Sequence, residues 1–338
     1  MKRLYLLAFT AFLTFASAQG ELFIYNWTDY TNPELIEKFE AETGISVTLD
    51  TYDTNETLLA KLKSGAAGYD IIVPSHNFVP IFISEGLLEP INASELPGYE
   101  NLDERWKSPE WDEGNVYTIP WQWGTTSFTI NTEQYTGPAD SLALLFEPPA
   151  ELQGQIGMFN SPDEVMAMAQ IYLGLPACNE STDDMRKVQD LLVAQKPFVK
   201  LYSSENIYER MAAGEVLAHQ QWNGSAMRAR AENPAVQYVF PKEGVVTWMD
   251  NLAVAAGAPN KDNALKFIEF MMQPENAGLQ SNFARYANGI AGSEEFMDAE
   301  LTSAPELGIP EGVPARFTPA CSAAAIELQD RVWTRIKQ

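Results

Sequence analysis

The order of strand and helix signals in the first quarter of the chain is the feature that most restricts its fold. Residues 21–25 alternate and are rich in β-forming side chains, while Asn32-Pro33-Glu34 supplies a helix cap, a proline and an acidic first turn, and Gly44 ends the helix. The elements that follow are a strand over 45–52, a helix over 56–63 and a strand over 69–73. This alternation is typical of a parallel α/β sheet.

The rest of the chain repeats the pattern and then returns to the first unit. The predicted elements are strands over 155–159, 216–220 and 246–255, and helices over 162–173, 183–194, 226–231, 261–272 and 323–337. Residues 147–157 and 303–314 are rich in glycine and proline and are predicted to be loops. About 320 residues follow the leader, more than one core comfortably holds, so we expect two domains.

The amino terminus has the composition of an export signal. Lys2 and Arg3 precede an apolar run over 4–15, and Ala16-Ser17-Ala18 offers a cleavage site of small residues. The run is too short to span a bilayer, and no later run approaches the ~20 apolar residues needed. No cysteine follows the cleavage site, so a lipid anchor is not indicated. We expect a soluble periplasmic protein.

Charge and cysteine content narrow the class further. The chain has 22 Lys and Arg against 46 Asp and Glu, and loss of Lys2 and Arg3 leaves about −26. This charge disfavours nucleic acid as a partner and attracts cations. Cys178 and Cys321 are the only cysteines, and in an oxidising compartment we expect them to form a disulfide.

Catalytic and cofactor motifs are scarce. The two histidines, His76 and His219, have no metal-ligand spacing, and the chain lacks a nucleophile elbow, a phosphate-binding loop and a dinucleotide fingerprint. The adjacent acids Asp163 and Glu164 cannot straddle a scissile bond. No cofactor or metal is expected, and an enzyme is the weaker hypothesis.

Four stretches place an indole or phenol beside an acid or amide. They are Tyr25-Asn26-Trp27-Thr28-Asp29-Tyr30, Gln221-Trp222-Asn223-Gly224, Trp248-Met249-Asp250 and Arg285-Tyr286-Ala287-Asn288. Aromatic faces next to carboxylates suit an organic cation, through cation–π contacts and charge-assisted hydrogen bonds. Residues 27–29 and 74–77 also fall at strand ends, where ligands bind in parallel sheets. The alternative is that these aromatics fill the core.

Glu164 has a purely structural interpretation from local sequence. Ser161-Pro162-Asp163-Glu164 matches a capping box, with Ser161 at the N-cap and Glu164 three residues later. On this pattern alone the Glu164 side chain would close the helix terminus.

Several of these segments, in this order, resemble the polyamine-binding proteins of bacterial ABC importers. The matching stretches are 25–28, 69–75, 222–225, 241–244 and 248–250. The resemblance implies a type II periplasmic binding fold, two α/β lobes around a ligand cleft. It places lobe 1 at 19–122 plus 246–302 and lobe 2 at 123–245 plus 303–338, after a signal peptide over 1–18. The chain would cross between lobes near 121–126, near 243–247 and after Glu300.

The family's ligand contacts carry over to ten positions. They are Trp27, Thr28, Asp29, Tyr30, Ser75, Glu164, Trp222, Trp248, Asp250 and Tyr286. Glu164 thereby acquires a second role, as an acid that faces the ligand. Arg285 departs from the pattern, because a cation there would oppose a polyamine unless it faces solvent. Ser225 stands where putrescine-type receptors carry an acid.

The resemblance implies a monomeric receptor that binds putrescine or spermidine and delivers it to an inner-membrane ABC permease. A receptor for another small organic cation, or an exported enzyme on the same fold, remains the alternative. Ser161 occupies a position that is acidic in spermidine-type receptors. With one acid fewer, we expect the shorter putrescine to bind more tightly.

Overall fold

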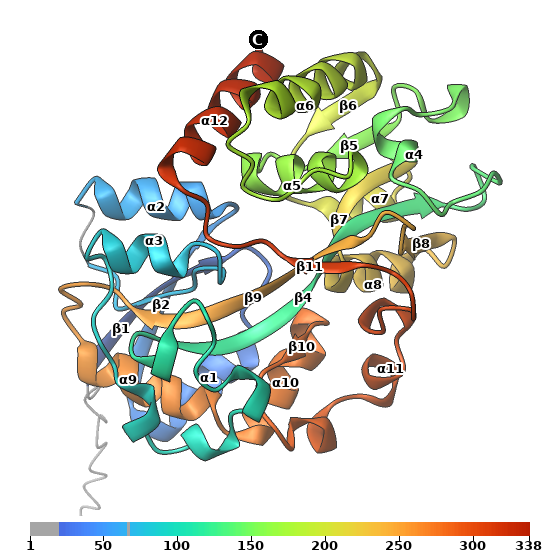
Figure 1. Ribbon diagram of the computed structural model, residues 1–338. Helices are drawn as coiled ribbons and strands as arrows, with labels where there is room; N and C mark the ends of the chain where they lie inside the picture. Colours follow the sequence, from blue (N-terminus) through green and yellow to red (C-terminus); the bar gives the residue numbers. More distant parts are fainter. Residues whose placement is uncertain (1–19, 66–67) are drawn as a thin grey trace, which may run out of the picture.

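The computed structural model describes residues 20–65 and 68–338, and its strands join into one mixed sheet (Figure 1). The expected leader over 1–18 lies outside the described residues. The strands in sheet order are β2 (Ile45–Tyr52), β1 (Gly20–Trp27), β3 (Ile71–Ile72), β9 (Val245–Val254), β4 (Thr118–Asn131), β7 (Ala218–Trp222), β5 (Ile156–Met158) and β6 (Val199–Tyr202). Three short strands pair at the side of this path: β8 (Val236–Val239), β10 (Ala287–Asn288) and β11 (Ala315–Phe317).

The opening strands are parallel, as the sequence predicts. β1 pairs in parallel with β2 and β3, and α1 (Pro33–Thr43) and α2 (Asn55–Lys63) connect them. The Asn32 side chain accepts the Glu34 N–H, and Gly44 ends α1 in the left-handed region at φ 70°. β9, however, runs antiparallel to both β3 and β4, so the sheet as a whole is mixed.

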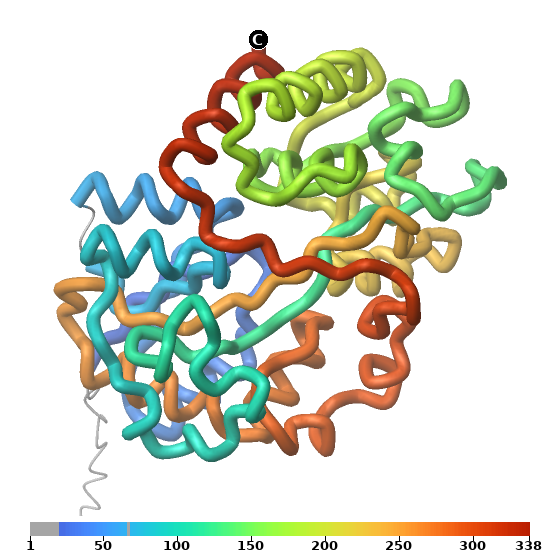
Figure 2. The backbone as a smooth tube through the Cα atoms, viewed as in Figure 1, coloured from blue at the N-terminus to red at the C-terminus, as the bar shows by residue number. Residues whose placement is uncertain are grey.

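Two long strands carry the chain from one lobe to the other. The first half of β4 pairs with β9, and its second half pairs with β7 and β8. A third passage follows α11 (Ala299–Thr302), where β11 lies along the start of β9 before the last helix (Figure 2). The predicted crossings near 121–126 and 243–247 fall within β4 and at the start of β9.

Each lobe has its own core. The first is built on β1, β3 and β9 beneath α1, α9 (Lys261–Met271) and α10 (Pro274–Ala284), and includes Leu22, Phe39, Val254 and Phe267. The second includes Phe128, Ile156, Met166, Leu192 and Ile336. Its helices are α4 (Ala143–Phe146), α5 (Pro162–Tyr172), α6 (Thr182–Gln195), α7 (Ile207–Ala212), α8 (Asn223–Glu232) and α12 (Ala323–Lys337); α3 (Val79–Ser84) packs on the first lobe. The lobe boundaries given above stay a prediction.

A disulfide ties two distant segments of the second lobe. Cys178 and Cys321 are 143 residues apart in sequence, yet their Cα atoms are 5.0 Å apart and their sulfurs are bonded. The bridge links the loop after α5 to the segment that precedes α12. Within the described ranges, no helix has the length and apolar content to cross a bilayer.

Candidate ligand-binding site

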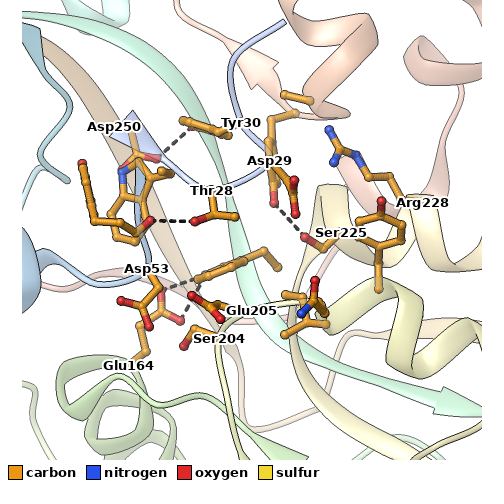
Figure 3. Close-up of a pocket in the computed structure, with 18 of the residues that line it drawn as sticks. Thr28, Asp29, Tyr30, Asp53, Glu164, Ser204, Glu205, Ser225, Arg228 and Asp250 are labelled. Atoms are coloured by element: carbon orange, nitrogen blue, oxygen red, sulfur yellow. Dashed lines mark hydrogen bonds between the residues drawn. The ribbon is translucent and has the colours of Figure 1, made fainter. Parts of the chain in front are cut away.

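All ten predicted contact residues line one cavity between the lobes (Figure 3). Trp27 ends β1, Ser75 follows β3, and Trp248 and Asp250 lie in β9. Glu164, in the first turn of α5, and Trp222, at the end of β7, come from the second lobe. The cavity is also lined by residues that sequence reasoning did not select: Tyr52, Asp53, Ser204, Glu205, Asn206, Ile207, Tyr208, Ser225, Arg228 and Ala284.

Asp250 is a buried carboxyl held by two hydroxyl groups. Its side chain is 5% exposed; Tyr30 Oη donates to Oδ2 at 2.8 Å and Ser75 Oγ donates to Oδ1 at 2.6 Å. The Asn55 amide in turn donates to Ser75 Oγ at 3.1 Å. Burial raises the pKa of Asp250 to about 7, although both hydrogen bonds act in the opposite direction. Near neutral pH this carboxyl is therefore poised between its charged and neutral forms.

Glu164 faces the cavity and does not cap its helix. Trp222 Nε1 donates to both carboxylate oxygens, at 2.9 and 3.1 Å. At the α5 terminus the Asp163 carboxylate accepts the Glu164 N–H at 2.8 Å and the Ser161 hydroxyl at 2.5 Å. The capping-box interpretation is wrong, because Asp163 supplies the acceptor from within the first turn and engages the Ser161 hydroxyl.

Desolvation also controls the charge of Glu164. Burial raises its pKa well above the usual value, and the nearby carboxylates of Asp163, Asp250 and Glu56 raise it further, whereas the Trp222 hydrogen bond lowers it. Two carboxyl groups in one cavity, one from each lobe, thus resist ionisation. A cation placed between them would remove that penalty.

The aromatic residues are packed against one another and also line the cavity. Trp27 Nε1 donates to Val73 O at 2.9 Å, and the Trp27 and Trp222 ring centroids lie 6.3 Å apart across the lobes in an edge-on arrangement. Tyr286 packs edge-on against Trp248 at 5.1 Å and against Tyr30 at 5.6 Å. Core packing and ligand contact are therefore not exclusive alternatives here, because the packing fixes the rings that form the walls.

The turn after β1 supplies a third carboxylate. Asp29 is exposed and adopts φ 55°, the left-handed region that few residues enter. The preceding Thr28 hydroxyl donates to Tyr52 O at 3.2 Å, which anchors the turn to β2. Asp29 thus lies at a rim of the cavity, and the other two predicted acids lie deeper.

Two positions that the sequence singled out, Ser161 and Arg285, lie outside the cavity. Ser161 does not line the cavity, because its hydroxyl is turned toward Asp163, so the argument from Ser161 to ligand length loses its basis. Arg285 also lies outside the cavity; it ends α10 at φ 67° and pairs with Asp298 at 3.7 Å. The cation that does line the cavity is Arg228.

A family model for bacterial extracellular solute-binding proteins matches residues 34–309. The chain belongs to this family. A putrescine/agmatine-binding protein of Pseudomonas aeruginosa is 30% identical to this chain over an alignment 340 positions long, which covers 95% of this chain and 93% of that one. A spermidine/putrescine-binding periplasmic protein of Escherichia coli is 36% identical over 290 residues, covering 85% and 83% of the two chains.

Solved structures agree with the fold. A protein from Listeria monocytogenes superposes on the solute-binding protein with a TM-score of 0.87 and 31% identity, covering 94% of this chain and 99% of that one. The spermidine/putrescine substrate-binding protein PotD of Streptococcus pneumoniae superposes with a TM-score of 0.77 and 26% identity over 94% and 98% of the two chains. The fold is the type II periplasmic binding fold, as predicted.

Most of the lining residues that the sequence did not reveal come from two places; the others are Tyr52 and Asp53 at the end of β2 and Ala284 at the end of α10. Residues 204–208 precede and begin α7, where no aromatic–acid motif marks them. Arg228 is three residues after Ser225 on α8, a spacing that puts both side chains on one helix face, and this was the available signal. No group of three or more potential metal ligands gathers in the described parts of the chain.

Proposed function

We propose that this solute-binding protein captures a polyamine, putrescine or spermidine, between its lobes and hands it unchanged to an inner-membrane ABC permease. The observation that carries the proposal is the pair of buried carboxyls with raised pKa, Asp250 and Glu164, in a cavity walled by aromatic rings. Primary ammonium groups satisfy the carboxylates, and the methylene chain lies against the rings. The ten predicted residues are the proposed contacts.

The names of the relatives support the same ligand class. Both the Pseudomonas and Escherichia proteins described above are named for binding putrescine, one together with agmatine and the other with spermidine. We propose a monomer, without catalytic activity, that is exported to the periplasm and cleaved near Ala18, with the lobe boundaries given above.

Ligand capture follows from where the contacts come from. Asp250 and Trp27 belong to the first lobe, and Glu164 and Trp222 belong to the second. A ligand that contacts both lobes binds the closed arrangement better than an open one, so it shifts the population toward closure. The closed form is then what the permease recognises.

Native mass spectrometry of protein purified from the periplasm tests the proposal directly, together with calorimetry against putrescine and spermidine. We expect one amine per chain, with its mass unchanged after prolonged incubation with the protein. If another organic cation is bound, the proposed role as a receptor stands and the proposed ligand is wrong. Binding of an anion or sugar and of neither amine would refute the proposal, and turnover of a bound amine would indicate an enzyme.

A further inference from the structure

One guanidinium lines a cavity that is otherwise rich in acids. Arg228 shares the cavity with Asp29, Asp53, Glu164, Glu205 and Asp250. Throughout residues 20–65 and 68–338, the ion pairs present pair other cations with carboxylates and do not involve Arg228. Its positive charge therefore acts on whatever the cavity holds.

The Arg228 side chain is also fixed in place. Nη2 donates to Phe283 O at 2.7 Å, and the guanidinium carbon lies 5.0 Å from the Phe283 ring centroid and 5.6 Å from the Tyr208 ring centroid. A carbonyl acceptor and two aromatic faces hold a cation without neutralising it. The charge thus has a defined position in the wall.

That position is across the cavity from the two buried acids. Figure 3 shows Arg228 beside Ser225, on the side opposite Asp250 and Glu164, with Asp29 between them. The Ser225 hydroxyl lies 3.3 Å from Tyr286 Oη. One side of the cavity therefore offers two desolvated carboxyls, whereas the other side carries the guanidinium of Arg228.

We propose that Arg228 limits the site to two ammonium groups and so selects a short diamine over a triamine. This inference rests on the proposed function. The ammonium groups of a diamine pair with Asp250 and Glu164, whereas the third ammonium of a triamine extends toward Asp29 and meets Arg228. Repulsion between like charges in a poorly hydrated cavity penalises the longer ligand, which is discrimination by an unfavourable contact.

Calorimetry of four proteins measures the effect as the ratio of the spermidine to the putrescine dissociation constant at one salt concentration. Arg228→Met keeps the length of the side chain and removes its charge, and Arg228→Lys keeps the charge. Arg285→Met is the matched control, because it removes one cation outside the cavity. Compared with the wild type, these variants distinguish the effect of the Arg228 charge on the ratio from the effects of side-chain size and of the protein's net charge.

We expect Arg228→Met to lower the ratio at least about tenfold, equivalent to about 1.4 kcal/mol, and the other two variants to stay close to wild type. An unchanged ratio in Arg228→Met, or an equal fall in Arg228→Lys, would overturn the inference. An equal gain in affinity for both amines would also overturn it, because it would show that Arg228 repels every cation alike and does not discriminate by ligand length. If the wild type binds neither amine, the proposed function fails and this inference with it. Melting temperatures establish that each variant is folded.

Discussion

Replacement of Asp250 by asparagine should stabilise the ligand-free protein while it weakens ligand binding. Asparagine has nearly the same shape, and its carbonyl can still accept the Tyr30 hydroxyl that now bonds Oδ2 at 2.8 Å. What it removes is the cost of holding a carboxylate that is 5% exposed. The two effects have opposite signs, and a merely structural residue would not produce that combination.

The magnitude follows from burial, which raises the pKa of Asp250 from its ordinary value of 3.8 to about 7. Because the folded pKa is the higher one, the carboxyl's favourable contribution is complete below pH 3.8 and is lost as the pH rises through 7. Three pKa units amount to about 4 kcal/mol of lost stability at pH 8.5, as an upper bound, and about 2 kcal/mol at pH 5.5. The Asp250→Asn gain should therefore shrink by about 2 kcal/mol between these pH values.

Urea unfolding of both proteins at pH 8.5 and 5.5, without ligand, measures this difference. Asp29→Asn is the matched control, because it removes an exposed acid from the rim of the same cavity. Binding to Asp250→Asn should weaken by at least about 2 kcal/mol. A variant that is less stable by the same amount at both pH values would show that burial does not perturb Asp250, and unchanged affinity would place Asp250 outside the site.

Three further predictions concern the same groups. Burial raises the pKa of Asp250 to about 7, so amine affinity should fall as the pH drops below 7, by up to about tenfold per pH unit. Calorimetry in buffers of different ionisation heat should then detect proton release on binding. Flat affinity from pH 7.5 to 5.5 would contradict this. Glu164→Gln should weaken binding without lowering the melting temperature, because burial disfavours the carboxylate that it removes. Asp163→Ala should cost about 1 kcal/mol of stability, because the Glu164 N–H at the start of α5 loses its acceptor. The reverse pattern would restore the capping-box interpretation. Breaking the Cys178–Cys321 bridge, which closes a 143-residue separation, should lower the free energy of unfolding by up to about 5 kcal/mol; equal melting temperatures with and without reductant, with the thiols shown to be free, would contradict that.

Elements with local start and stop signals were predictable, whereas β4, one of the two strands that join the lobes, was not. α1 begins and ends where Pro33 and Gly44 place it. β4 was missed because Pro120 and Gly124 interrupt its pattern, although it spans Thr118–Asn131. A Cβ at position 124 would lie 2.3 Å from Asn223 Oδ1 and 2.7 Å from Trp248 Cζ2, so the strand needs glycine at that crossing. Such a requirement comes from tertiary contact and leaves no periodic signal.

In the site, too, some residues were predictable from the sequence and others were not. The acid–aromatic segments mark Trp27, Trp222 and Asp250, because each lies in or at the end of a strand that reaches the cavity. The sequence misled where two neighbouring acids could serve the same helix terminus. Ser161 and Glu164 suggested a capping box, yet the Asp163 carboxylate accepts the Glu164 N–H, and the Glu164 side chain bonds Trp222 instead. The sequence left the direction of Arg285 open, since adjacency to Tyr286 does not determine which way a helix-ending residue points; the structure pairs it with Asp298, outside the cavity.

The electrostatics of the two buried acids explain why such a receptor would close on a cation. With the lobes together, Asp250 from β9 and Glu164 from α5 line one cavity, and the charge on Asp250 raises the pKa of Glu164. Bringing the two carboxyls together without a ligand therefore costs desolvation and mutual repulsion. A neutral molecule of the right shape relieves neither penalty. An amine removes both, so the same charge arrangement that disfavours an empty closed form stabilises the closed form with its ligand.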